Sequence, residues 1–166
     1  MASMNRESTS SGGLQLTSSA FQPGQAIPTA HTCDGADRSP PLSWHGLSSG
    51  TRALALVVDD PDAPGGVFTH WVYFDLPVGT AGLPAGVPTT ARPEPGGIQG
   101  RNDFGTIGYR GPCPPPGPAH HYRFKLYALD QPVALRPGAS KDELIQAMQG
   151  HELGQTELVG TYQRRG

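Results

Sequence analysis

The alternation of apolar and polar positions along the chain predicts a mostly β fold. Residues 53–59 read Ala-Leu-Ala-Leu-Val-Val-Asp, an unbroken apolar run typical of a strand that is buried on both faces. Aromatic and β-branched residues predict a second strand at 70–76. Shorter apolar runs predict strands at 14–18, 42–44 and 158–162, and no internal repeat is present.

The clearest strand is predicted at residues 120–129, where the even positions lead into an apolar series and positions 121, 123 and 125 are His, Arg and Lys. Because successive side chains of a strand point to opposite faces, His120 and Tyr122 share the apolar face with Phe124. His121 points the other way, which excludes it from any site built around His120.

One helix follows late in the chain. Residues 140–143, Ser-Lys-Asp-Glu, form a capping box, in which the serine and glutamate side chains satisfy free backbone N–H groups. Leu144, Ile145 and Met148 then give an apolar stripe, and Gly150 is a natural stop. We expect this helix to cover the sheet.

Length and composition indicate one folded domain. The 166 residues suit a single hydrophobic core. Residues 1–13 are rich in Ser and Gly and predict a disordered tail, which leaves 14–166 as the domain. The chain has 23 Gly and 18 Pro, many of them between residues 77 and 118, which predicts one long, turn-rich excursion.

Charge and hydropathy exclude several classes of protein. The net charge is −2 and no basic stripe is present, which argues against a nucleic-acid or membrane-surface binder. The longest apolar run, residues 53–58, is far too short to span a membrane. Residues 1–13 lack an apolar signal segment, so we expect a cytoplasmic protein.

Two proline-stiffened loops, each leading to a strand histidine, are the candidate functional features. Asp60-Pro61-Asp62-Ala63-Pro64 precedes His70, and residues 111–117, Gly-Pro-Cys-Pro-Pro-Pro-Gly, precede His120 and Tyr122. Proline fixes its own φ and restricts the residue before it, so these loops are rigid before a ligand arrives. We predict that they form one small anion-binding pocket.

The residue types fit a phosphoryl group. His70 and His120 each offer a ring N–H and Tyr122 a hydroxyl, the donors that such oxygens require. Asp60 is expected to orient a histidine, whereas Asp62 either caps its turn or lines the pocket.

Metal, cofactor and catalytic motifs are missing from the sequence. The histidines and aspartates could supply metal ligands, yet they lack the short spacing of a dedicated site, so neither a metal nor a cofactor is expected. No Gly-x-Ser-x-Gly elbow occurs, and Asp103-Phe104-Gly105 lacks the other kinase motifs.

Cys33 and Cys113 both lie in loops expected to border the pocket. A cytosolic protein keeps such residues as thiols, but a disulfide is geometrically feasible. The sequence leaves both states open.

Five motifs, in order, resemble the phosphatidylethanolamine-binding proteins, and in particular their bacterial and archaeal, Raf-kinase-inhibitor-like branch. The resemblance covers roughly residues 14–164. The motifs are Ser-Pro-Pro-Leu-Ser-Trp at 39–44, Asp-Pro-Asp-Ala-Pro at 60–64, His-Trp at 70–71, Gly-Tyr-Arg-Gly-Pro at 108–112 and His-His-Tyr-Arg-Phe at 120–124.

The resemblance implies a fold and a site. The fold is mainly β, an antiparallel β-sandwich-like arrangement with a large central sheet, a smaller sheet and a peripheral C-terminal helix. The pocket binds phosphate, phosphorylethanolamine or similar anions. The ligand-binding residues that the resemblance implies are Asp60, Ala63, Pro64, His70, Gly111, His120 and Tyr122. We add Asp62, Cys113 and Pro114 to the expected ligand-binding residues, although Cys113 stands where animal members of the family usually carry glycine.

Three functions remain open at this point. The first is a binding module for a small anionic or phosphoryl ligand, with a protein kinase or protease as the regulated partner and a homodimer as a reasonable assembly; the partners come from the resemblance. The second is a hydrolase-type enzyme that uses an Asp60–His pair as general base. The third is an interaction protein that acts through its surface.

Overall fold

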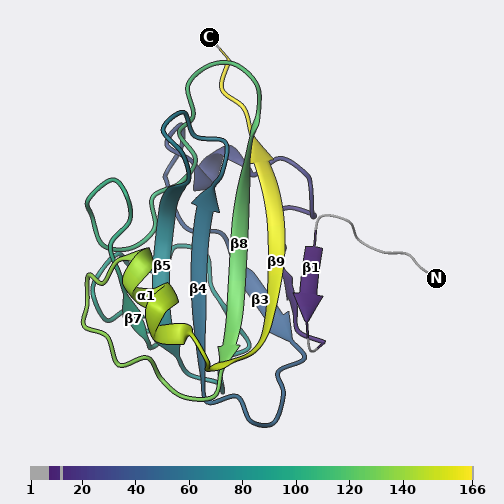
Figure 1. Ribbon diagram of the computed structural model, residues 1–166. Coiled ribbons are helices and arrows are strands. Elements are labelled where there is room, and N and C mark those ends of the chain that lie inside the picture. Colours follow the sequence, from purple (N-terminus) through teal and green to yellow (C-terminus); the bar gives the residue numbers. More distant parts are fainter. Residues whose placement is uncertain (1–7, 12, 166) are drawn as a thin grey trace, which may run out of the picture.

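The computed structural model describes residues 8–11 and 13–165. They form a six-stranded antiparallel sheet, of order β1-β9-β8-β4-β5-β7, and a three-stranded antiparallel sheet, of order β2-β3-β6 (Figure 1). The strands are β1 Ser8–Ser11, β2 Gln15–Thr17, β3 Leu42–His45, β4 Ala53–Asp60, β5 Phe68–Leu76, β6 Gly82–Leu83, β7 Ile98–Gln99, β8 His120–Leu129 and β9 Glu152–Tyr162; the helix is α1 Lys141–Met148, and a 3-10 turn covers Thr29–His31. The mainly β, sandwich-like prediction is confirmed.

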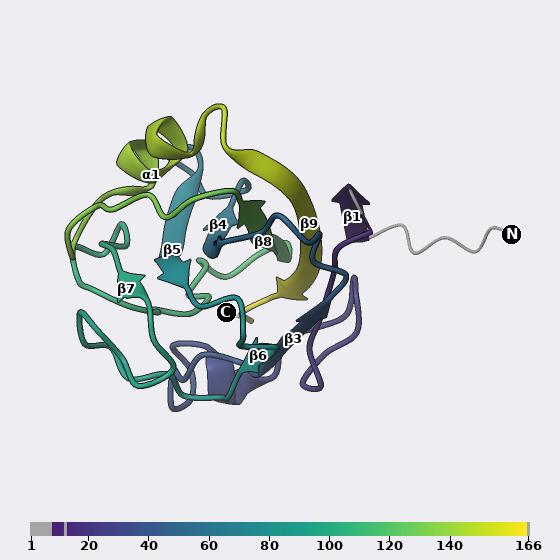
Figure 2. The same ribbon diagram turned by 90° about the horizontal axis from the view of Figure 1, so that it is seen from below.

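The main core fills the space between the two sheets, which face each other in the end-on view of Figure 2. β8 alternates as predicted, and β4 is buried on both faces as its unbroken apolar run predicted; every second residue of each strand enters this core. The buried residues of these strands are Leu54, Leu56, Val58, Tyr122, Phe124, Leu126 and Ala128, and Leu16, Leu42, Trp44 and Leu83 meet them from the small sheet. The face of the sheet that carries Tyr122, one of the expected site residues, is therefore apolar.

A second core lies on the opposite face of the large sheet, beneath α1 (Figure 1). Val57 and Phe74 pack there against Leu144 and Met148 of the helix. The predicted capping box is present: the Ser140 hydroxyl accepts the Glu143 N–H at 3.1 Å, and the Glu143 carboxylate accepts the Ser140 N–H at 2.8 Å. The predicted helix is confirmed, and it covers the sheet.

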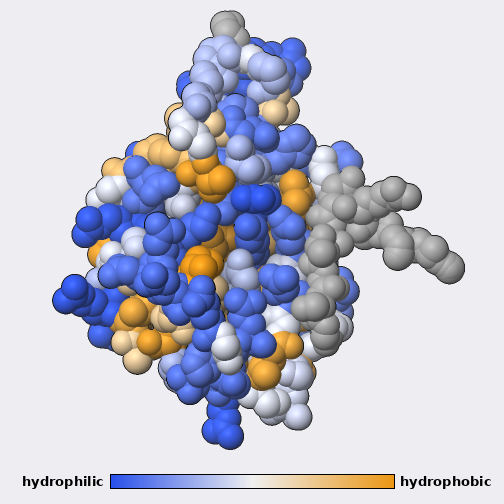
Figure 3. Space-filling view, in the orientation of Figure 1, coloured by the Kyte–Doolittle hydropathy of each residue, from blue (hydrophilic) through white to orange (hydrophobic). Residues whose placement is uncertain are grey.

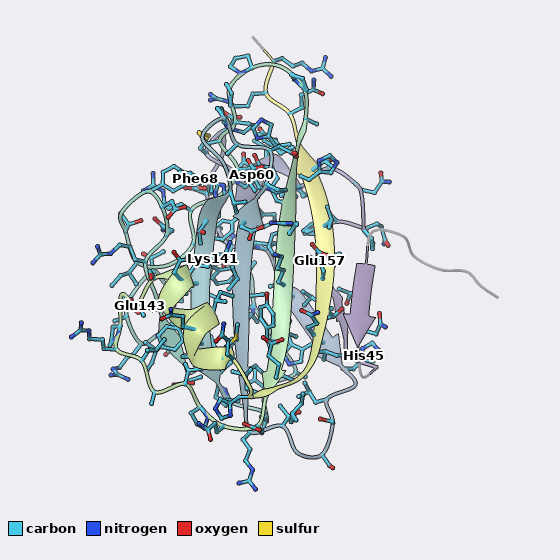
Figure 4. All side chains as sticks on the ribbon, in the orientation of Figure 1. His45, Asp60, Phe68, Lys141, Glu143 and Glu157 are labelled. Atoms are coloured by element: carbon cyan, nitrogen blue, oxygen red, sulfur yellow. A yellow bond between two sulfur atoms is a disulfide. The ribbon has the colours of Figure 1, made fainter. Side chains whose placement is uncertain are left out.

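A buried carboxylate ties this helix to the sheet. Asp59 is inaccessible to solvent and accepts hydrogen bonds from Arg123 at 2.8 Å and Lys141 at 2.9 Å, with Lys125 at 3.6 Å. Burial alone would raise the pKa of Asp59, but the three cations hold it below its usual range. The face of the molecule seen in Figure 3 is mainly hydrophilic, and Figure 4 places Lys141 on α1 in front of the sheet.

Three differences separate the strands from the sequence-based expectation. β9 begins at Glu152 rather than 158; its first half is polar because it lies between β1 and β8 and is stabilised by backbone pairing rather than by apolar side chains. The two-residue strands β6 and β7 are too short for a periodic signal.

The third difference concerns the tail predicted over residues 1–13. Residues 8–11 form β1, which pairs with β9 through main-chain groups, and a Ser/Thr-rich segment can make such bonds as well as any other. Residues 1–7 and 12 lie outside the described part of the chain. No helix among the described residues is long and apolar enough to cross a membrane.

Candidate ligand-binding site

Three strand ends meet at one edge of the large sheet. In an antiparallel sheet the end of β4 lies beside the starts of β5 and β8, so that Asp60, His70 and His120 come together although far apart in sequence. Figure 4 shows Asp60 and Phe68 at this edge. A pocket of about 220 Å³ opens there, lined by Asp60, Ala63, Pro64, Phe68, His70, Phe104, Cys113, Pro114, Pro115, His120 and Tyr122.

Most of the residues expected at the site do line this pocket, but Asp62 and Gly111 do not. The Asp62 carboxylate turns away to accept the backbone N–H of His121 and to contact its ring Nδ1, both at 2.8 Å. The hydrogen bonds from His121 lower the pKa of Asp62. Gly111 lies behind the wall, where its N–H donates to Asp37 at 2.8 Å and its Cα packs against the His31 carbonyl.

Phe68, Phe104 and Pro115 also line the pocket and were not predicted. Phe68 arrives through pairing, because it lies opposite Asp60 in the β4–β5 register. Phe104, from the triplet that resembles a kinase motif, packs edge-on against Phe68 at 4.8 Å and His70 at 5.6 Å between ring centroids. A loop residue of this kind has no periodic signal in the sequence.

His120 is held by Asp60. Its Nδ1 lies 2.7 Å from the Asp60 carboxylate, and both side chains are buried. The same carboxylate accepts the Asp62 N–H at 2.7 Å, which fixes the turn that follows β4. Because an ionised carboxylate only accepts hydrogen bonds, the ring carries its proton on Nδ1, and Nε2 is left for a ligand.

A β-bulge places His70. The β4–β5 register pairs Val58 with Trp71 and Asp59 with Thr69, so His70 is the extra residue between them. A bulge re-aims its side chain, and here it brings the imidazole to the pocket edge. The His70 Nδ1 lies 2.7 Å from the Arg110 carbonyl oxygen, an acceptor, which requires Nδ1 to carry the proton.

The protonation state of His70 differs from the expectation that both imidazoles offer an N–H to the ligand. Burial lowers the pKa of His70, and the Arg110 carbonyl and the nearby carboxylates oppose this only in part. At neutral pH the ring is therefore neutral, and its Nε2 presents a lone pair rather than a proton.

Tyr122 lies between the two imidazoles. Its ring stands edge-on to His70 at 5.4 Å and is stacked on His120 at 6.4 Å. The hydroxyl is buried and has no hydrogen-bond partner of good geometry among the described residues. Burial, together with the adjacent Asp60 carboxylate, raises the pKa of Tyr122, so the hydroxyl remains a neutral donor.

The pocket rim is closed by a disulfide between Cys33 and Cys113, whose Cα atoms are 5.4 Å apart. The sequence had left this bridge open. Two further bonds join the same loops: Cys33 N–H donates to the Pro112 carbonyl at 3.1 Å, and the Tyr109 hydroxyl donates to the His31 carbonyl at 2.6 Å. One wall of the pocket is therefore held in place before a ligand binds. Among the described residues, no group of three or more His, Cys, Asp or Glu side chains has a metal-binding arrangement.

Comparison with known proteins identifies the family. A profile described as phosphatidylethanolamine-binding protein matches residues 17–163. The chain belongs to the phosphatidylethanolamine-binding protein family. The relatives of this chain include a UPF0098 protein of Methanothermobacter thermautotrophicus. It is 51% identical over 151 residues, which cover 91% of this chain and 99% of that protein.

Two further relatives extend the family comparison. Mycobacterium tuberculosis LppC, whose name provisionally classes it as a lipoprotein, is 41% identical over 90% of this chain and 72% of its own length. The crystal structure of Escherichia coli YbcL, described as a new member of the mammalian phosphatidylethanolamine-binding protein family, superposes with a TM-score of 0.85. It is 33% identical and covers 92% of this chain and 99% of its own.

Proposed function

We propose that this chain is a binding protein that captures a small anionic group of the phosphoryl type in the pocket at the β4, β5 and β8 ends. The observation that carries the proposal is the convergence of His70 and His120 on Tyr122. Each imidazole has Nδ1 fixed by a protein acceptor, while its Nε2 has no partner among the described residues. Two oriented rings with free polar atoms suit a small polar guest.

The unpartnered Tyr122 hydroxyl supports the same proposal. A buried polar group without a hydrogen bond costs about 1–3 kcal/mol, and a ligand oxygen that accepts this hydroxyl relieves the cost. The aromatic walls contributed by Phe68 and Phe104 keep the local dielectric low, which strengthens every hydrogen bond formed inside. The cavity of about 220 Å³ is smaller than the usual pocket for a drug-sized molecule, so the guest is a small group.

Titration with inorganic phosphate tests the proposal. We expect saturable binding by calorimetry, with shifts of the imidazole proton signals of His70 and His120 in NMR spectra. His120→Ala should weaken phosphate binding about tenfold or more, since it removes a hydrogen bond to a charged group. His45→Ala is the matched control, because His45 is exposed on β3 and lies far from Asp60 in Figure 4. Absence of phosphate binding by the intact protein would refute the proposal.

A second candidate is a hydrolase-type enzyme, favoured by one observation: the buried Asp60 orients His120 at 2.7 Å, as a general base requires. Esterase and phosphatase substrates should then be turned over by the intact protein and not by His120→Ala. If His120→Ala loses phosphate binding and the intact protein turns over no substrate, the binding function stands alone.

The kinase or protease partner, the homodimer and the cytoplasmic location expected from the sequence stay predictions. The disulfide between Cys33 and Cys113 favours an oxidising compartment over the cytoplasm, because reduced thiols are the rule in the cytosol. Alkylation of free thiols in freshly lysed cells distinguishes these locations, since only a reduced protein is labelled at both residues.

A further inference from the structure

We propose that the pocket selects the singly protonated form of a phosphate-type ligand, whose own hydroxyl donates a hydrogen bond to Nε2 of His70. This inference rests on the proposed anion-binding function and narrows it. In this arrangement His70 recognises the protonated oxygen of the ligand, while His120 and Tyr122 bind its unprotonated oxygens. Free phosphate and phosphate monoesters both have such a protonated form, so both belong to this class of ligand.

The surroundings of His70 make its Nε2 an acceptor. The Arg110 carbonyl occupies Nδ1 at 2.7 Å, which fixes the tautomer. The ring is enclosed by Phe68, Phe104 and Tyr122, at centroid distances of 5.1, 5.6 and 5.4 Å. Such a setting disfavours imidazolium. Because a fully deprotonated oxygen against this lone pair would set two acceptors face to face, the ligand atom there must carry hydrogen.

The charged groups that face His70 do not reverse this state. Asp60 at the end of β4 and the loop residues Asp37 and Asp103 all favour the imidazolium. Burial among the aromatic rings outweighs them together, so the pKa of His70 stays below its ordinary value.

The charge balance of the cavity points the same way. None of the described residues that line it is Lys or Arg, and its one carboxylate, Asp60, is buried. Even with a proton on both nitrogens of His120, the His120–Asp60 pair sums to zero. Arg110, at the rim, stacks over Phe104 at 4.7 Å and already pairs with Asp37 at 3.3 Å. A dianion would therefore enter a low-dielectric site without a matching cation, whereas a monoanion brings half that charge.

Methyl phosphate and methyl sulfate test the inference, because the two monoanions match in size and charge and differ by one hydroxyl hydrogen. At about pH 6, close to the second ionisation of phosphate monoesters, roughly half of the methyl phosphate holds that proton. We expect methyl phosphate to bind about tenfold more tightly than methyl sulfate, as sites that accept a ligand hydroxyl reject analogues lacking it. His70→Gln should bring the ratio below about threefold, since an amide N–H can donate to sulfate.

The ³¹P chemical shift of bound methyl phosphate gives a second readout that needs no variant. We expect the bound ligand to keep the shift of the monoanion up to at least one pH unit above its ionisation in solution. Equal affinities for the two ligands, or a bound shift of the dianion, would overturn the inference while leaving anion binding intact. Failure of both ligands and of inorganic phosphate to bind would overturn the proposed function as well.

Discussion

Reduction of the Cys33–Cys113 bridge should destabilise the protein by an amount that follows from the chain length it closes. The two cysteines are separated by 80 residues. The chain-entropy relation gives about 4.5 kcal/mol for a loop of that length, and residual structure in the unfolded chain reduces the measured value. We therefore expect the free energy of unfolding to fall by about 2–4.5 kcal/mol, a large part of the 5–15 kcal/mol typical of a domain.

Urea denaturation with and without a reducing agent measures this difference. The double variant Cys33→Ala/Cys113→Ala is the matched control, because its free energy of unfolding should not respond to the reductant. Equal free energies of unfolding for the oxidised and reduced wild type, to within about 1 kcal/mol, would show that the bridge does not constrain the unfolded chain as argued.

Three further perturbations separate stability from binding. Tyr122→Phe should leave the free energy of unfolding unchanged or raise it, because the Tyr122 hydroxyl has no hydrogen-bond partner of good geometry among the described residues, while phosphate binding measured by calorimetry weakens. Tyr109→Phe removes a buried hydrogen bond of 2.6 Å and should instead lower the free energy of unfolding by about 1–2 kcal/mol. Because the pKa of His70 is lowered in the folded protein, the unfolded chain binds this proton at a higher pH, and the free energy of unfolding falls as the pH drops below about 6.5. His70→Gln should flatten that part of a plot of urea midpoint against pH, and an unchanged slope would contradict the lowered pKa. Asp59→Asn should lower the free energy of unfolding by about 2–3 kcal/mol, because it leaves cations without a partner. Lys141→Met should lower it by less than about 1 kcal/mol, because the Lys141 side chain is 24% exposed; similar losses for the two variants in thermal or urea unfolding would refute this reasoning.

Anion binding should have its own pH dependence. Because bound anions favour imidazolium, affinity for phosphate should rise as the pH falls from about 8 to about 5.5. Burial lowers the pKa of His70, and the neutral ring accepts a hydrogen from the ligand, so its share of the rise follows the protonation of phosphate and not of the ring. Calorimetric titrations across this range check the expectation, and an affinity for phosphate that does not change with pH would contradict both the imidazolium and the preference for the protonated ligand.

The sequence predicted the elements whose signal is periodic. The alternation at residues 120–129 placed His120 and Tyr122 on the core face, and Ser140 and Glu143 marked the start of α1. Those features depend on neighbours along the chain, which a single sequence displays directly.

The remaining features depend on partners that are distant in sequence. Strict alternation from His70 through Val72 and Phe74 would put the imidazole on the helix-covered face, and only the bulge against β4 turns it to the pocket. Phe104 reaches the site from a loop, and Asp62 is drawn away by His121, which faces outward as predicted. The disulfide could not be decided because it depends on the redox state of the compartment as well as on geometry.

The division of the site between strands and loops has an evolutionary consequence. Asp60, His70 and His120 stand on paired strands, whereas Ala63, Phe104 and their neighbours on the rim stand on connections between them. Insertions or exchanges in those connections would leave the sheet unchanged. A lineage could thus change which molecules reach the pocket while Asp60, His70 and His120 stay as they are.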